Sequence, residues 1–187
     1  MKKLASILLM SLSLCAMARP HYVKVMSYNI KNANGMDNKC DIQRVANVVN
    51  TERPNIVAIQ EVDSMTARSG NRYILGELAE RTNMHAFFAP AIDYDGGKYG
   101  IGVLSREKPL SVKSVALPGR EEARTMFVAD FMKYTFVGTH LSLTEEDRIA
   151  SLPIIKSITD TCSKPVFVAG DFNDTPGSAF INAMSQD

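Results

Sequence analysis

The sequence predicts an α+β fold in which two β-sheets pack face to face and helices cover their outer faces. The first observation is that short apolar segments of strand length outnumber the amphipathic segments of helix length. The second is that five strand-like segments follow one another in the middle of the chain, joined by turn-forming stretches such as Asp95-Gly96-Gly97 and Pro118-Gly119. This spacing favours hairpins over crossover helices, and many strands with occasional helices predict two packed sheets.

The amphipathic segments give the expected helices. Over residues 41–52 the apolar residues fall on one helical face, with Asp41 as the expected N-cap and Pro54 beyond the end. Further helices are expected over 73–81 and 144–161, and another begins after a turn at 174–177. Because proline removes a backbone donor, Pro153 is expected to kink or interrupt the third of these helices.

Eight segments are predicted to be strands because they are short, apolar and rich in β-branched or aromatic residues. They are 22–29, 56–62, 87–89, 100–105, 111–116, 125–131, 134–139 and 165–172. The composition is 45% hydrophobic, with no low-complexity segment or repeat, so a single core is expected.

Residues 1–18 have the layout of a secretory signal peptide. Lys2 and Lys3 precede an apolar stretch that ends before the small-x-small sequence Ala16-Met17-Ala18. A lipoprotein anchor at Cys15 is the alternative, but the bulky Leu14 before it is atypical of such signals. We therefore expect cleavage near Ala18, export to the periplasm or the medium, and a domain over 19–187 without stable membrane insertion.

Charge and cysteine content exclude some classes of protein. The formal net charge is +1, and removal of residues 1–18 takes it slightly below zero. This balance gives no support to a protein that binds nucleic acid by bulk charge, although it allows a nuclease with a local basic cleft. Beyond the signal, Cys40 and Cys162 permit either a disulfide or two free thiols, and no cysteine spacing indicates structural zinc.

Four predicted strands end in polar residues that an apolar core does not require. These are Asn29, Glu61, His140, and Asp171 with Asn173. If the strand ends converge, carboxylates would hold a hard cation, and amide and imidazole groups would contact phosphate oxygens. This combination of residue types is suited to hydrolysis of a phosphoester.

The order of five short motifs makes the resemblance specific. They are SYNI at 27–30, AIQEV at 58–62, YGIGVLSR at 99–106, GTHL at 138–141 and GDFN at 170–173. With these motifs the chain resembles the endonuclease/exonuclease/phosphatase family, which includes deoxyribonuclease I. The resemblance implies a four-layer α/β/β/α sandwich and a phosphoester hydrolase that uses Mg²⁺, with Mn²⁺ as a substitute.

The resemblance also implies roles for individual residues. Glu61 would be the principal magnesium ligand, supported by Asn29, which would also contact the phosphate. Asp171 would position the attacking water, while Asn173 and His140 would donate to the phosphate or the leaving group. Tyr99 and Arg124 resemble residues that line the phosphate site in some members of the family.

Simpler structural roles remain open for several of these residues. Glu61 would ordinarily be an exposed carboxylate, and His140 a structural histidine. Tyr99 could equally belong to the core. Arg124 could be a surface ion-pair partner of Glu121 or Glu122.

The family's closing Ser-Asp-His-like motif has no counterpart after Asp171 in this sequence. We therefore expect the C-terminal part of the domain to be missing and the second sheet to be incomplete. The leading expectation is an exported, monomeric phosphodiesterase. Its substrate would be nucleic acid, a phospholipid headgroup, or a sugar or inositol phosphate. The alternative is a non-catalytic exported module that binds phosphate or another ligand, or an inactive fragment of the enzyme.

Overall fold

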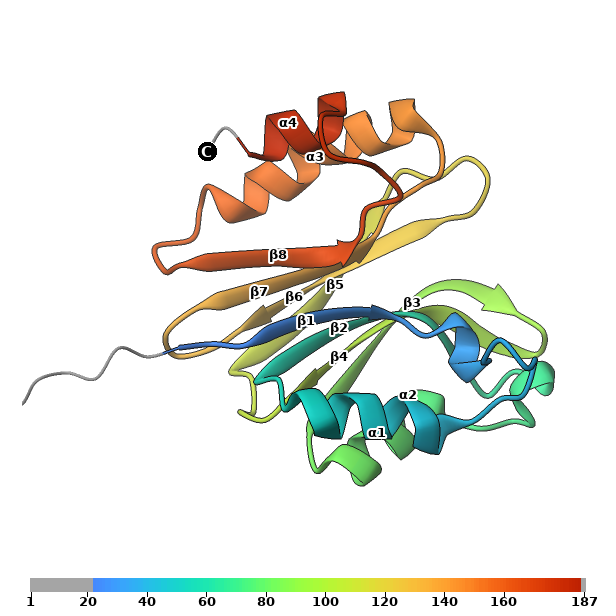
Figure 1. Cartoon of the computed structure of the whole chain (residues 1–187). Helices are drawn as coiled ribbons and strands as arrows, with labels where there is room; N and C mark the ends of the chain where they lie inside the picture. The colour runs from blue at the N-terminus through green and yellow to red at the C-terminus, as the bar shows by residue number, and fades with distance from the viewer. Residues whose placement is uncertain (1–21, 186–187) are drawn as a thin grey trace, which may run out of the picture.

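The computed structural model describes residues 22–185 and contains two four-stranded sheets between two pairs of helices (Figure 1). The first sheet has the strand order β1-β2-β4-β3 and the second the order β5-β6-β7-β8. The strands are β1 Val25–Asn29, β2 Ile56–Ser64, β3 His85–Tyr94, β4 Gly97–Ser105, β5 Ser111–Leu117, β6 Arg124–Asp130, β7 Thr135–His140 and β8 Val166–Asp171. This is the four-layer arrangement expected from the sequence. The signal peptide predicted over residues 1–18 lies outside the described residues.

The helices are α1 Ile42–Glu52, α2 Ile74–Thr82, α3 Glu145–Thr159 and α4 Ala179–Met184, with short 3-10 turns η1 Lys31–Ala33 and η2 Ala67–Ser69. The predicted N-cap is confirmed, because the Asp41 carboxylate accepts a 3.0 Å hydrogen bond from the backbone N–H of Arg44. Among the described residues, no helix is both long and apolar enough to cross a membrane.

The expected interruption of α3 at Pro153 is wrong, since the helix runs through this residue from Glu145 to Thr159. Pro153 lies on the exposed side of the helix. The carbonyl that loses its helical donor can therefore bond to water, which lowers the cost of an internal proline.

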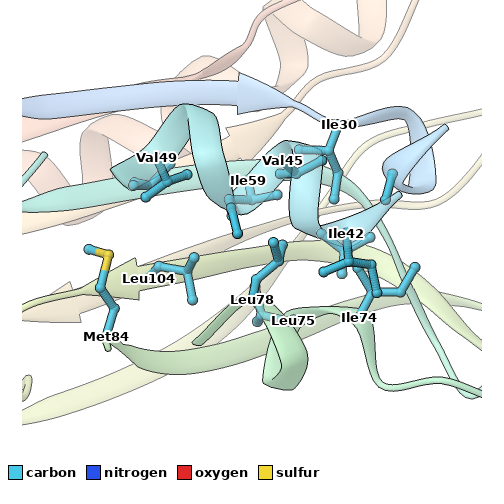
Figure 2. Close-up of a cluster of buried hydrophobic side chains, with 14 residues drawn as sticks. Ile30, Ile42, Val45, Val49, Ile59, Ile74, Leu75, Leu78, Met84 and Leu104 are labelled. Atoms are coloured by element: carbon cyan, nitrogen blue, oxygen red, sulfur yellow. The ribbon is translucent and has the colours of Figure 1, made fainter. Parts of the chain in front are cut away.

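Three apolar clusters hold the layers together. In the first, Val45 and Val49 of α1 and Leu75 and Leu78 of α2 pack on Ile59 and Leu104 of the first sheet (Figure 2). The second fills the space between the sheets, with Phe127 and Phe136 facing Ile101 and Val103. The third joins the second sheet to α3 and α4 through Ile155 and Phe180.

Strand pairing brings the polar strand ends to one end of the sandwich. β1 pairs in parallel with β2, and β7 pairs in parallel with β8. β1 and β8 are the edge strands on the same side of the two sheets, and their arrowheads point the same way (Figure 1). Asn29, His140 and Asp171 are the last residues of their strands, as predicted.

Glu61 does not end its strand as predicted, because β2 continues to Ser64. The pairing of β2 with β4 shifts between Ile59 and Val62, so Gln60 and Glu61 together lie opposite one residue of β4. Glu61 has a φ of +57°, a left-handed conformation that non-glycine residues rarely adopt. This bulge breaks the alternation of the strand and leaves Glu61 half-buried between buried neighbours.

Candidate active site

The side-chain amide of Asn29 links the two sheets at the candidate site. Its Nδ2 donates to Glu61 Oε1 at 2.7 Å and to Asp171 Oδ2 at 3.0 Å. Its Oδ1 accepts a 3.0 Å hydrogen bond from the backbone N–H of Lys31. The amide therefore holds two carboxylates from different sheets on either side of one NH₂ group. The predicted role of Asn29 as a metal and phosphate contact stays a prediction.

The negative charge of Glu61 is not neutralised by a basic side chain in the described part of the protein. Within residues 22–185, no lysine or arginine forms an ion pair with Glu61. In the same range, no group of three or more His, Cys, Asp or Glu side chains could enclose a metal ion on its own. Mg²⁺ is commonly bound by one or two carboxylates, with water and substrate phosphate completing its shell. The donor set of Glu61 and Asp171 fits this kind of site.

Asp171 is itself positioned by the residues around it. The backbone N–H of Asn173 donates to Asp171 Oδ1 at 3.0 Å, and the Asn173 amide Nδ2 donates to the carbonyl of Leu141 at 2.8 Å. Asn173 has a φ of +49°, which asparagine tolerates better than most residues. The turn after β8 thus anchors Asp171 and Asn173 to the end of β7.

His140 lies beside Asp171, with 3.8 Å between His140 Nε2 and Asp171 Oδ2. The imidazole is buried. Burial lowers the pKa of His140, the positive charge of Arg124 lowers it further, and Asp171 and Glu61 act in the opposite direction. A neutral imidazole keeps one N–H donor and one acceptor nitrogen, which suits it to contact a phosphate oxygen without adding charge.

Arg124 is buried, so the alternative interpretation of it as a surface residue is wrong, although its ion pairs with Glu121 and Glu122 do form. Nη2 lies 3.5 Å from Glu121 Oε1, and Nη1 lies 3.2 Å from Glu122 Oε1. Its Nε is buried and, among residues 22–185, finds no hydrogen-bond partner. A buried arginine donor without an acceptor is costly, and a phosphate oxygen would satisfy it.

Tyr99 approaches these residues from the first sheet. Together with Arg124 and His140 it lines a small cavity of about 10 Å³ between the sheets. Burial raises the pKa of the Tyr99 phenol, and the negative charges of Glu61 and Glu122 act in the same direction. The hydroxyl therefore stays protonated at neutral pH and available as a donor.

All seven residues singled out from the sequence thus lie at one end of the sandwich, contributed by β1, β2, β4, β6, β7, β8 and the turn after β8. A family comparison bears directly on this arrangement. The model of the endonuclease/exonuclease/phosphatase family matches residues 26–186. The chain belongs to this family.

Solved structures with the same fold support the family assignment. The endonuclease/exonuclease/phosphatase from Beutenbergia cavernae is 23% identical, with a TM-score of 0.66 over 84% of this chain and 50% of that one. A family protein from Bacteroides thetaiotaomicron is 16% identical, with a TM-score of 0.69 over 90% and 69% of the two chains. D. rerio TDP2, complexed with a single-strand DNA product, is 18% identical, with a TM-score of 0.65 over 87% and 64%.

These identities are low, so the structural likeness concerns the fold. The present chain spans half the length of the Beutenbergia cavernae protein. No curated protein sequence matches it. As a family member, the chain is related to phosphoester hydrolases.

Sequence reasoning missed a second group of polar residues beside Glu61. Asp63 is fully buried in β2 and forms an ion pair with Arg68. The signal was an acidic residue inside an otherwise apolar strand, because a buried carboxylate requires a partner. The pair becomes visible only when the turn η2 brings Arg68 back over the strand.

Proposed function

We propose that the protein is an exported, Mg²⁺-dependent phosphoester hydrolase that acts on phosphodiesters. The observation that carries this proposal is the double hydrogen bond from Asn29 to Glu61 and Asp171. It brings two carboxylates together at the end of the sandwich where His140 also lies, together with the Nε of Arg124, which has no hydrogen-bond partner in the described part of the chain. Family membership supports the reaction class.

In this proposal each residue acts through an atom whose position is known. Glu61 and Asp171 would hold the divalent ion. The Asn29 amide fixes the position of both carboxylates, because it donates a hydrogen bond to each of them. The bound ion supplies neutralisation of phosphate charge and a lowered pKa for water. Arg124, His140 and Tyr99 would donate to the nonbridging oxygens. Asp171 would orient the attacking water and accept its proton on the carboxylate oxygen not bound to the ion. As the water oxygen bonds to phosphorus, the bond from phosphorus to the ester oxygen would break, and the leaving oxygen would depart as an anion or take a proton from solvent.

The test is hydrolysis of bis(p-nitrophenyl) phosphate by the whole chain with Mg²⁺ or Mn²⁺, and with EDTA as the metal-free condition. Glu61→Gln and Asp171→Asn should each lower the rate by roughly 10²-fold or more, since each removes a carboxylate from the reacting centre. Glu80→Gln, on the exposed side of α2, is the matched control. Full activity in EDTA, or in both site variants, would refute the proposal.

Metal binding gives a second readout that does not depend on turnover. Mn²⁺ binding measured by titration calorimetry should weaken in Glu61→Gln and persist in Glu80→Gln. Binding of inorganic phosphate in the presence of Mg²⁺ without any hydrolysis would instead favour the non-catalytic binding module. Single-stranded DNA, inositol phosphates and sphingomyelin, offered in parallel, would separate the substrate classes. The complex of D. rerio TDP2 with a single-strand DNA product makes DNA a reasonable member of that set.

Export and oligomeric state are separate parts of the proposal. Mass spectrometry of protein recovered outside the cytoplasm should give the mass of residues 19–187 if cleavage follows Ala18. Recovery of the uncleaved chain would contradict the proposed signal. Light scattering should give the mass of a monomer.

A further inference from the structure

A polar cavity of about 300 Å³ opens next to Glu61 and Tyr99, and neither Asp171 nor His140 is among the residues that line it. This volume is at the small end of the range of ligand sites in proteins. Its remaining lining residues are Lys31, Asn32, Asn34, Arg68, Tyr94 and Glu122. The cavity shares Glu61 with the candidate metal site, so one molecule could place its phosphate at that site and another of its groups in the cavity.

Arg68 is held rigidly at the wall of this cavity. Its Nε and Nη2 each donate to the carboxylate of Asp63 at 2.7 Å, and Asp63 is fully buried. The Thr66 hydroxyl donates to the same carboxylate at 2.9 Å. The guanidinium carbon lies 4.3 Å from the ring centre of Tyr94 and 5.4 Å from that of Tyr99. A side chain fixed in this way loses little entropy when it binds a ligand.

The balance of charge argues against a second phosphate in this cavity. Asp63 neutralises Arg68, and the carboxylate of Glu122 lies in the same wall as Lys31. An anion placed here would face Glu122 and compete with Asp63 for the guanidinium. A neutral group would neither be repelled by Glu122 nor compete with Asp63 for the guanidinium of Arg68.

The chemistry of the wall also argues against an apolar group. None of the lining residues in the described chain is aliphatic. Pockets for bases and acyl chains are lined mainly by hydrophobic side chains. Here amide, ammonium, carboxylate and phenol groups supply both donors and acceptors, as neighbouring hydroxyl groups require.

We propose that this cavity binds the hydroxyl-bearing part of a small phosphoester, such as a sugar or cyclitol ring, while its phosphate lies at Glu61. This inference rests on the proposed function for the position of the phosphate. It assigns Lys31, Asn34, Tyr94 and Glu122 to recognition of the ring hydroxyls. A small polyol is favoured over a nucleic-acid strand because the chain is nearly neutral, with a formal net charge of +1.

The first test measures binding without metal or turnover, so it is independent of hydrolysis. Myo-inositol is titrated at millimolar concentrations into the ¹⁵N-labelled whole chain in EDTA, with cyclohexanol as the apolar control. Backbone amide shifts are expected at Lys31, Asn34 and Tyr94 with myo-inositol and not with cyclohexanol. Equal shifts with both compounds, or no shift at these residues, would overturn the inference. So would shifts there with inorganic phosphate or a dinucleotide but not with myo-inositol.

The second test uses specificity. Asn34→Leu keeps the approximate volume of the side chain and removes its hydrogen-bonding groups. We expect it to lower the ratio of kcat/KM for the phosphodiester p-nitrophenyl myo-inositol 1-phosphate to that for bis(p-nitrophenyl) phosphate by roughly 10-fold or more. Asn50→Ala, remote on α1, is the control and should leave the ratio unchanged. An unchanged ratio in Asn34→Leu would overturn the inference. If neither ester is hydrolysed by the unmodified chain, the proposed function fails, and the titration alone decides whether the cavity binds polyols.

Discussion

Arg148 on α3 and Asp174 after β8 form an ion pair of 3.1 Å between side chains that are only 10% and 7% exposed. The same guanidinium donates from Nη1 to the carbonyls of Ser142 and Leu143, at 3.2 and 2.8 Å. Arg148 therefore ties the turn that follows Asp171 to the turn that follows His140. It lies outside the candidate site and fixes the two turns that adjoin His140, Asp171 and Asn173.

Arg148→Met should destabilise the fold by about 3–5 kcal/mol, because it leaves the buried carboxylate of Asp174 without an opposite charge. Urea unfolding measures the change. Lys98→Met, which removes an exposed ion pair with Asp93, is the control and should cost less than about 1 kcal/mol. The double variant Arg148→Met with Asp174→Leu should regain much of the loss. An equal free energy of unfolding for Arg148→Met and the unmodified chain would show that the ion pair does not fix these turns.

Asn29→Ala removes the donor shared by Glu61 and Asp171. In the metal-free protein the free energy of unfolding should fall by about 1–3 kcal/mol, because two half-buried carboxylates are left facing each other without that hydrogen bond. Mg²⁺ should therefore raise the stability of the variant by more than it raises the stability of the unmodified chain. Thermal unfolding with and without Mg²⁺ measures both effects. Asn50→Ala removes an exposed hydrogen bond, which the Asn50 side-chain amide donates to the carbonyl of Arg81, and is the matched control. Equal Mg²⁺ effects in the two chains would contradict the shared role.

The arrangement of layers could be predicted because its signals are local. Apolar periodicity, together with Asp41 and Pro54, located α1 to within a residue, and turn-forming stretches located the hairpins. Strand length was less predictable. β3 was expected only over 87–89, yet it extends from His85 to Tyr94, because pairing with β4 continues past Pro90 after a shift in register. Such pairing depends on a partner strand that local sequence does not describe.

The candidate site divides in a similar way. Motifs pointed to Glu61, His140 and Asp171, but they could not show the bulge that orients Glu61, since its geometry depends on pairing with β4. The burial of Arg124 was also invisible, because an arginine next to two glutamates resembles a surface ion pair. The Asp63–Arg68 pair was missed since its meaning depends on a turn returning over the strand.

The stability of the metal-free protein should fall as the pH drops below about 6.5, in part because of His140. Burial holds the pKa of His140 below its usual value, so the unfolded chain takes up this proton more readily than the folded one. His140→Gln should flatten the fall, measured by urea unfolding in EDTA between about pH 7.5 and pH 5. His85→Gln, at an exposed position, is the control. An identical pH dependence in His140→Gln and the unmodified chain would contradict the assigned shift.

Glu121 should stabilise the fold at neutral pH and lose this effect in acid. Its carboxylate accepts hydrogen bonds from the Ser142 hydroxyl at 2.6 and 2.8 Å and from the Leu143 N–H at 2.6 Å. The Ser142 hydrogen bond is the largest factor that lowers the pKa of Glu121, to about 2. Since the unfolded chain protonates this group near its usual value of 4.5, the stabilisation is complete above that pH and disappears as the pH falls towards about 2.

Glu121→Gln should therefore be less stable than the unmodified chain at neutral pH, and the difference should close as the pH falls from about 4.5 towards 2. Acid unfolding followed by circular dichroism measures this difference. Ser142→Ala should behave similarly, because without the hydroxyl the pKa of Glu121 rises towards its usual value. Glu80→Gln, which changes the same charge on the surface of α2, should show no such closure. A difference between Glu121→Gln and the unmodified chain that stays constant from neutral pH into acid would mean that the effect comes from packing rather than from the ionised carboxylate.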